Sequence, residues 1–461
     1  MIKKTTIILV LTLLCIYSLL GQVNVKHYDL DYKLDFVNNK LFGVATLHIN
    51  GQEDTLNLLL YRLLKVTSVT DSLGNSIDYT QEVVSFEDFD ELQVNHIQIA
   101  LPNRNESLIT LQFNGCVLGY AETGMKYVKD RISPDFTIIR MDAFSYPVLG
   151  RPSSEDLRAS VSNNFFDYNI AITIPDSLIA VTLGKPIGVS KHANQTRYVF
   201  QSIQPTWRMD VAIGKYATLK KNNFNIHYFK EDSIGAHRVL RAVEQTSELY
   251  NSWFGKKNLG NFTIIEIEDG YGSQTDKCGI IQTATAFKQS EYLEEVYYEV
   301  SHLWNVPHTD KAPCRLESEG LAMFLQFLVK EKIENKNNYL EERAESTLKK
   351  VKNQIADSDE EFSSTPIIAY GEKNITDYSY SKGMLFFYLL YHTVGEEAFF
   401  KAMKGYYLTF ENKGSTTKEF AEYLKNYFTS NKVDKLVNDW IFTNQSTSYL
   451  LSCEKIEDLW K

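Results

Sequence analysis

The sequence predicts a multidomain α+β protein, in which an antiparallel β-sandwich or saddle is followed by a mainly helical domain. Three observations support this fold class. The chain has 461 residues, which is too long for one compact core. Short runs of alternating apolar and polar residues dominate 22–219, whereas apolar residues at helical spacing dominate the second half. Hydrophobic residues make up 44% of the chain and aromatic residues 13%, which is enough to fill several cores.

The first 21 residues have the features of a secretory signal peptide. Lys3 and Lys4 precede an apolar run, 7–20, which ends before the small residue Gly21. Two alternatives stay open, namely an uncleaved signal that anchors the chain and lipidation of Cys15. After residue 21, no apolar run reaches the roughly 18 residues that a membrane span needs. We therefore expect a secreted or periplasmic protein without a membrane span, with attachment through the signal or Cys15 as the alternative.

The net charge makes nucleic acid an unsuitable partner. The chain carries 48 basic and 58 acidic residues, a net charge of −10. Loss of Lys3 and Lys4 with the signal would move the net charge to −10 − 2 = −12. Nucleic-acid binding depends on clustered Lys and Arg side chains. Neutral or cationic peptides fit this surface better.

The β-rich segment, 22–219, contains strand-like runs separated by turn residues. Helical periodicity is scarce in it, so we expect an antiparallel β domain of about 200 residues. The clearest strand-like runs are 26–36, 41–49, 96–102, 107–113, 169–175, 177–183 and 196–201.

The second domain, predicted at 220–395, mixes strands and helices. Residues 223–230 and 261–269 have the pattern of strands, and 237–255 has that of an amphipathic helix that ends at Gly255. The last segment, 396–461, is predicted to be a C-terminal helical extension.

The stretch 294–327 carries the main candidate for chemistry. On a helix, Tyr298, Glu299 and His302 lie on adjacent faces, because positions three and four apart are neighbours across a turn. In the zinc motif H-E-x-x-H, two histidines four residues apart bind the metal and the glutamate acts as general base. Here Tyr298 stands in place of the first histidine. Glu319 opens a second helix-like run and could bring another carboxylate to the same metal.

These motifs resemble the aminopeptidase N family, the gluzincin zinc metallopeptidases of membrane alanyl aminopeptidase and leukotriene-hydrolase type. Their motif is H-E-x-x-H-x-W followed by N-E-G-x-A, and this chain has Y-E-V-S-H-L-W at 298–304 and S-E-G-L-A at 318–322. The family's Y-x-K-G run is matched by Y-S-K-G at 380–383. The opening of the β domain and its end at 206–220 are also similar to the family.

The resemblance implies a thermolysin-like catalytic domain at 220–395, a zinc cofactor and peptide substrates. It makes His302 and Glu319 the zinc ligands, with Tyr298 a weak third, and Glu299 the general base. Tyr380 would donate a hydrogen bond to the oxyanion of the tetrahedral intermediate.

The segment 273–281 lies where the family has a glycine-rich edge strand that binds the substrate backbone. Asp276 stands at the position of the glutamate that binds the free amino terminus, and Gly279 matches a family glycine. Lys277 beside Asp276 introduces a charge that could neutralise it. The alternative is an edge strand without a role in substrate binding.

Two departures from the family weaken the zinc site. A neutral phenol at Tyr298 is a poor ligand, and the segment from His302 to Glu319 is two residues shorter than the family's usual spacing. His308, six residues after His302, could replace the missing ligand as in the metzincin pattern, with Asn305 at that pattern's glycine position. The alternative is that His308 is a loop histidine.

Four cysteines follow the signal, and their spacings match no zinc or redox motif. They could form disulfides in an oxidising compartment or stay buried thiols. They are Cys116, Cys278, Cys314 and Cys453.

Two hypotheses for function therefore stay open. The first is a secreted zinc metallopeptidase or aminopeptidase with an altered metal site. The second is a catalytically inactive pseudo-aminopeptidase that binds peptides or proteins in the same cleft.

Overall fold

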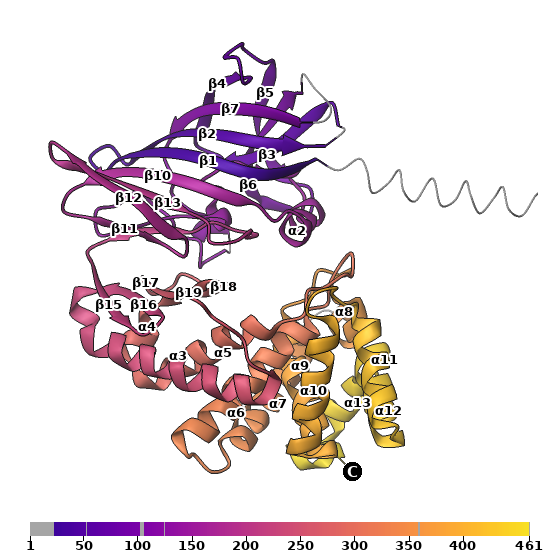
Figure 1. Cartoon of the computed structure of the whole chain (residues 1–461). Helices are drawn as coiled ribbons and strands as arrows, with labels where there is room; N and C mark the ends of the chain where they lie inside the picture. The colour runs from indigo at the N-terminus through magenta and orange to yellow at the C-terminus, as the bar shows by residue number, and fades with distance from the viewer. Residues whose placement is uncertain (1–22, 52, 102–105, 124, 358–359, 461) are drawn as a thin grey trace, which may run out of the picture. The chain divides into compact units, whose positions relative to one another are not determined.

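The chain forms two compact units. The first consists of Met1–Glu231 and Asn261–Gly272, and the second of Asp232–Gly260 and Ser273–Lys461. Unit 1 is built mainly of strands and unit 2 mainly of helices (Figure 1), so the predicted fold class is confirmed. The structure is a computed structural model, and it describes residues 23–51, 53–101, 106–123, 125–357 and 360–460.

The predicted signal peptide, 1–21, and with it Cys15, lies outside the described residues. Among the residues that are described, no helix is both long and apolar enough to cross a membrane. None of the four described cysteines forms a disulfide, and three of them are buried, so the thiol alternative applies to them.

Unit 1 holds most of the strands. Its strands are β1 (Asn24–Asp35), β2 (Lys40–Asn50), β3 (Thr55–Tyr61), β4 (Leu64–Thr70), β5 (Tyr79–Phe86), β6 (Phe89–Ala100), β7 (Glu106–Gly115), β8 (Phe136–Ile139), β9 (Val148–Leu149), β10 (Asp167–Pro175), β11 (Ile179–Thr182), β12 (Lys185–His192), β13 (Gln195–Gln201), β14 (Val211–Gly214), β15 (Tyr216–Lys221), β16 (Phe224–Phe229) and β17 (Phe262–Ile267). Its short helices are η1 (Ala121–Thr123), η2 (Met141–Ala143) and α2 (Ser154–Asn163), and η3 (Lys230–Asp232) leads into unit 2.

The sheets of unit 1 follow from strict alternation along the strands. A seven-stranded sheet has the order β12-β13-β10-β1-β2-β7-β4, beside sheets of order β5-β6-β3-β9 and β11-β14-β8. Tyr28, Leu30, Tyr32 and Leu34 of β1 all point inward, as period-2 patterning requires. Pairing in the seven-stranded sheet is antiparallel except between β1 and β10, which run parallel. The inward side chains of the seven- and four-stranded sheets form one continuous core.

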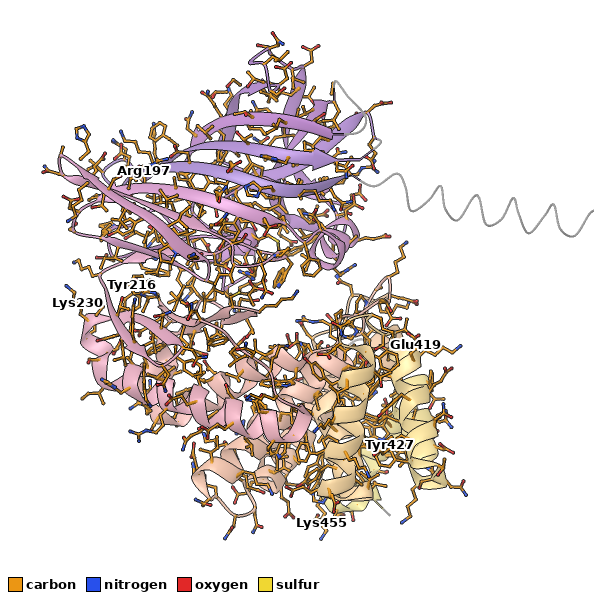
Figure 2. All side chains as sticks on the ribbon, in the orientation of Figure 1. Arg197, Tyr216, Lys230, Glu419, Tyr427 and Lys455 are labelled. Atoms are coloured by element: carbon orange, nitrogen blue, oxygen red, sulfur yellow. The ribbon has the colours of Figure 1, made fainter. Side chains whose placement is uncertain are left out.

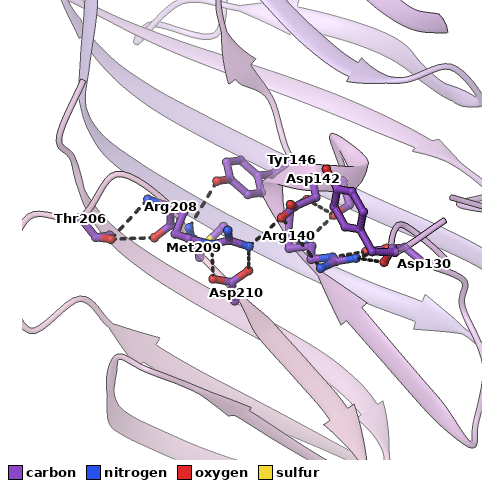
Figure 3. Close-up of polar contacts among 10 residues, drawn as sticks. Asp130, Arg140, Asp142, Tyr146, Thr206, Arg208, Met209 and Asp210 are labelled. Carbon is purple, nitrogen blue, oxygen red and sulfur yellow. Dashed lines mark hydrogen bonds and ion pairs between the residues drawn. The ribbon is translucent and has the colours of Figure 1, made fainter. Parts of the chain in front are cut away.

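A network of buried charges lies inside unit 1 (Figure 3). Arg208 donates from Nε and Nη2 to Asp210, at 2.6 Å each, and from Nη2 to Asp142 at 2.7 Å. Arg140 forms the same two-pronged contact with Asp130, at 2.8 and 2.7 Å. The Arg208 and Asp210 side chains are only 2% and 3% exposed. Each carboxylate in this network therefore depends on an arginine for its charge balance.

Loss of Arg208 should be costly, because it leaves Asp210 without its arginine and leaves Asp142 with only the longer ion pair to Arg140, at 4.0 Å. We expect Arg208→Met to lower the free energy of unfolding by about 3–5 kcal/mol. The exposed pair of Arg197 and Asp31, 40% and 51% exposed, is the matched control, and Arg197 is labelled in Figure 2. We expect Arg197→Met to cost less than about 1 kcal/mol. Urea unfolding measures both, and equal losses would contradict the assignment.

Unit 2 contains the remaining elements. Its strands are β18 (Gln274–Asp276) and β19 (Gly279–Thr283). Its α-helices are α3 (Ser233–Phe254), α4 (Ala284–Lys288), α5 (Leu293–Ser301), α6 (Leu321–Glu334), α7 (Tyr339–Asp357), α8 (Glu360–Ser364), α9 (Tyr378–Val394), α10 (Glu396–Phe410), α11 (Thr417–Phe428), α12 (Asn431–Val437) and α13 (Gln445–Ser452). Shorter turns are η4 (Ser290–Tyr292), η5 (His302–Trp304), η6 (Leu316–Gly320), η7 (Ile367–Ala369), η8 (Asn438–Phe442) and η9 (Ile456–Trp460).

Helix α5 lies at the centre of unit 2, packed against α3 and α6, while α9 packs against α6, α7 and η6. The contact between α9 and η6 is a backbone contact. A Cβ atom on Gly383 would lie 2.7 Å from Cα of Gly320, and one on Gly320 would lie 2.8 Å from Cα of Gly383. Only glycine at both positions permits this approach. It brings the segment of Glu319 against the segment of Tyr380.

Candidate functional site

Helix α5 positions three of the predicted site residues. Glu294 and Glu295 lie in its first turn, where acidic side chains complement the helix dipole. The helix ends at Ser301 and continues as the tighter turn η5, which begins with His302. The rings of Tyr298 and His302 pack edge to face, with centroids 4.8 Å apart. The predicted four-residue spacing thus puts both side chains on one face.

Glu319 reaches this face from η6, which has π-helical hydrogen bonding. Its two carboxylate oxygens accept hydrogen bonds from different partners. The Tyr298 hydroxyl donates to Oε2, and Arg315 Nη2 donates to Oε1. Nε2 of His302 lies 3.6 Å from Oε2. The carboxylate is therefore held by a phenol, a guanidinium and an imidazole.

The His302 ring is oriented by its other neighbour. The Asn305 side-chain nitrogen lies 2.8 Å from Nδ1 of His302. This contact holds the imidazole so that Nε2 faces Glu319.

Glu299 is buried beside these groups. The Thr275 hydroxyl of β18 donates to its Oε2 at 2.6 Å. Burial raises the pKa of Glu299 to about 7, although His302 and Thr275 act in the opposite direction. A carboxylate with this pKa has the balance of acid and base forms that proton transfer at neutral pH requires.

Tyr380 stacks on Tyr298, with ring centroids 6.5 Å apart and an interplanar angle of 16°. The Arg315 guanidinium lies over the Tyr380 ring, 5.4 Å from its centroid. Burial raises the pKa of both tyrosines, and for Tyr298 the charge of Glu319 adds to the increase. Both side chains are therefore neutral phenols that can donate a hydrogen bond.

These residues do not fit a zinc ion. A zinc ligand must direct a lone pair at the metal, but the Tyr298 hydroxyl donates its proton to Glu319, and Arg315 pairs with the same carboxylate. Within the described part of the chain, no group of three or more His, Cys, Asp or Glu side chains is placed to hold a metal. The predicted ligands are adjacent, but their hydrogen bonds are directed at one another.

The predicted substitute ligand, His308, contacts other residues. Its Nε2 lies 3.4 Å from the Ser318 hydroxyl and its Nδ1 lies 4.0 Å from Oε2 of Glu317. Asn305, which occupies the glycine position of the metzincin pattern, has an extended backbone, with φ −65° and ψ 142°. The Asn305 side chain orients His302.

The two predicted substrate-binding residues lie on one hairpin. Asp276 ends β18 and pairs in register with Gly279, the first residue of β19. Asp276 follows Thr275, which contacts Glu299. The hairpin is thus connected to the site through the contact of Thr275 with Glu299.

Sequence analysis did not identify two residues of this site, Arg315 and Thr275. The four-residue spacing of Arg315 and Glu319 is a signal for a helical ion pair that could have been noticed. The left-handed backbone of Arg315, φ 66° and ψ 16°, has no sequence signal, because arginine rarely adopts it. Thr275 could have been suspected only as a neighbour of Asp276.

Lys382, the lysine of the Y-S-K-G run, forms no hydrogen bond with the described residues of this site. Lys382 is 1% exposed, and its Nζ is buried without a hydrogen-bond partner among the described residues. It lies 5.8 Å and 5.7 Å from the ring centroids of Phe362 and Tyr370. Burial lowers its pKa to about 8.

Comparison with known protein families assigns a family to the segment that carries these site residues. Residues 280–440, which include α5, η6 and α9, match the model of the peptidase family M1 domain. This chain carries an M1 peptidase domain. The resemblance to the aminopeptidase N family is thereby confirmed. No curated protein matches the chain.

Solved structures similar to this chain include an M1 zinc metallopeptidase and an LTA4 hydrolase. An M1 zinc metallopeptidase from Deinococcus radiodurans has a TM-score of 0.64 at 16% identity, covering 92% of this chain and 95% of that one. Native yeast LTA4 hydrolase has a TM-score of 0.66 at 17% identity, covering 91% of this chain and 68% of that one. At these identities, the similarity establishes the fold.

A methyl group between η6 and α9 should displace Glu319. In an ordinary helix, Gly→Ala stabilises by about 0.5–1 kcal/mol. For Gly383→Ala we expect the opposite, a loss of about 1–3 kcal/mol, because the new Cβ would lie 2.7 Å from Gly320. In Gly188→Ala, the control, the Cβ makes ordinary contacts at 3.6 Å. Thermal unfolding compares the two, and stabilisation by Gly383→Ala would refute the close contact.

The low pKa of Lys382 predicts a pH-dependent stability. Its pKa is about 8 in the folded chain and 10.5 ordinarily, so below pH 8 the folded state must bury a charge. Between pH 8 and 10.5 the folded state releases this proton first, and stability should rise by about 3 kcal/mol. Lys382→Met should be more stable than the parent at pH 7 and lack this increase. Exposed Lys349→Met is the control, and parallel pH profiles for Lys382→Met and the parent would contradict the prediction.

Proposed function

We propose that this M1-family protein binds peptides through their amino-terminal residues and does not hydrolyse them as a zinc enzyme. One observation carries the proposal. Both oxygens of Glu319 already accept hydrogen bonds, from Tyr298 and from Arg315. The leader with Lys3 and Lys4 supports a secreted or periplasmic location, where extracellular peptides would be the ligands.

The hairpin of β18 and β19 supplies the peptide-binding edge. β18 is the last strand of its sheet, so its outer edge can accept an extended peptide by main-chain hydrogen bonds. Asp276 at the end of β18 supplies a carboxylate for the ammonium group of a free amino terminus. A variant of the similar Deinococcus radiodurans enzyme is bound to the substrate Tyr-Ser-Ala, which supports a short peptide as the ligand.

Binding without hydrolysis can be tested with matched peptides. We expect Tyr-Ser-Ala to bind the protein with a micromolar to millimolar Kd in calorimetry, and its N-acetylated form to bind about tenfold more weakly. Asp276→Asn should remove this difference. Glu422→Gln, which changes an exposed acid on α11 and gives the same net charge, should leave it unchanged. If neither Tyr-Ser-Ala nor a mixed tripeptide library binds, the proposal is wrong.

The burial of Glu299 favours a second candidate, a peptidase in which Glu299 is the general base. Its pKa near 7 and its hydrogen bond from Thr275 suit that role. The two candidates differ in turnover of aminoacyl p-nitroanilides with added zinc. Turnover that disappears in Glu299→Gln would establish the peptidase and end the proposal of binding alone.

A further inference from the structure

We propose that Arg315 replaces a metal ion as the counter-charge of Glu319, so that two residues, Tyr298 and Arg315, close the metal site of this M1 domain. The inference is independent of peptide binding, since it concerns only what neutralises Glu319. It also predicts that restoring the first histidine of the motif will not restore the metal site.

The contacts of Arg315 support this role. Its Nη2 donates to Oε1 of Glu319, while its guanidinium lies over the ring of Tyr380. The guanidinium is thus held on one side by a carboxylate and on another by an aromatic face. Both contacts favour a positive charge. A metal ion bound to the same carboxylate would meet this fixed charge and be repelled.

The backbone of Arg315 points to the same role. Its φ of 66° and ψ of 16° place it in the left-handed region, which a residue with a Cβ enters at a free-energy cost. Its carbonyl accepts a hydrogen bond from the amide of Glu319 at 2.9 Å. The strained residue therefore begins the turn that presents Glu319 and also supplies its counter-ion. Strain of this kind persists where the surrounding contacts offset it.

The hydrogen bonds to the two oxygens of Glu319 explain why one substitution is not enough to restore a zinc site. Tyr298 uses Oε2 of Glu319 and Arg315 uses Oε1. Tyr298→His would supply a second imidazole and release Oε2, but Oε1 would stay paired with a guanidinium that is always charged. Arg315→Leu alone would release Oε1 but leave a phenol in place of an imidazole. Only both changes together give His302, a second histidine and Glu319 free lone pairs.

Zinc titration of four proteins tests the proposal. The parent, Tyr298→His, Arg315→Leu and the double variant are each titrated with zinc in competition with a chromophoric chelator. We expect the double variant to bind one zinc on the order of a hundredfold more tightly than either single variant, because it alone combines three ligands with no opposing charge at Glu319. His302→Ala in the double variant should abolish this binding. Tyr298→His combined with Arg315→Lys, which keeps the charge, should bind like Tyr298→His alone.

Two results would overturn the inference. If Tyr298→His alone binds zinc as tightly as the double variant, Arg315 does not oppose the metal. If the double variant binds no more tightly than the single variants, Arg315 is not the group that closes the site. Both results concern zinc affinity, so they are distinct from the peptide-binding test of the proposed function.

A second measurement uses no metal, so it also tests the role of Arg315 in variants that do not bind zinc. Arg315→Leu removes the guanidinium from the buried Glu319 and leaves the carboxylate with Tyr298 and His302, so we expect a lower melting temperature. Glu319→Gln in the same chain removes that charge and should recover most of the loss, whereas a merely structural role for the Arg315 side chain would give additive losses. Additive losses would overturn the counter-charge role. Circular dichroism of each variant shows that it is folded.

Discussion

The negative charge of Glu319 is the constraint on which the site in unit 2 depends. Taking a carboxylate out of water is costly unless a positive charge and hydrogen bonds replace its hydration. Burial by itself would raise the pKa of Glu319, but His302, Arg315 and Tyr298 together lower it. The charge of Glu319 is therefore balanced by side chains of the protein, because the Tyr298 hydroxyl and the Arg315 guanidinium both donate to this carboxylate.

The two helical segments can meet at this carboxylate only because their backbones touch. The contact of Gly320 with Gly383 leaves no room for a side chain on either helix. Close approach then places the ring of Tyr380 against that of Tyr298 and beneath Arg315. The glycines of the S-E-G and Y-S-K-G runs thus have a packing reason. It applies equally to an enzyme and to a binding protein, so the persistence of these motifs does not by itself indicate catalysis.

The fold was predictable because its signals are local and repeated. Alternation along β1 and helical periodicity in α3 report burial directly, and the motif order placed Tyr298, His302, Glu319 and Tyr380 in one site. The parallel pairing of β1 with β10 and the position of His308 beside Glu317 were not predictable, since both depend on segments far apart or on loop conformation. The left-handed turn at Arg315 was hidden for the same reason. Sequence identified Tyr298, Glu299, His302, Glu319 and Tyr380, but not Arg315, Thr275 or the hydrogen bonds that these two residues donate to the site.

Those hydrogen bonds are what distinguish the two functions that the sequence left open. A zinc site needs each ligand to direct a lone pair at one point, whereas here Tyr298 and Arg315 both donate hydrogen bonds to Glu319. Glu299, by contrast, keeps a hydrogen bond from Thr275 and a pKa of about 7, features that a general base would have. The part of the site that would move protons is therefore preserved more fully than the part that would hold a metal. Tyr298 and Arg315 both act on Glu319, whereas the proposed peptide would add to the separate edge of β18, so the two proposals can be tested independently.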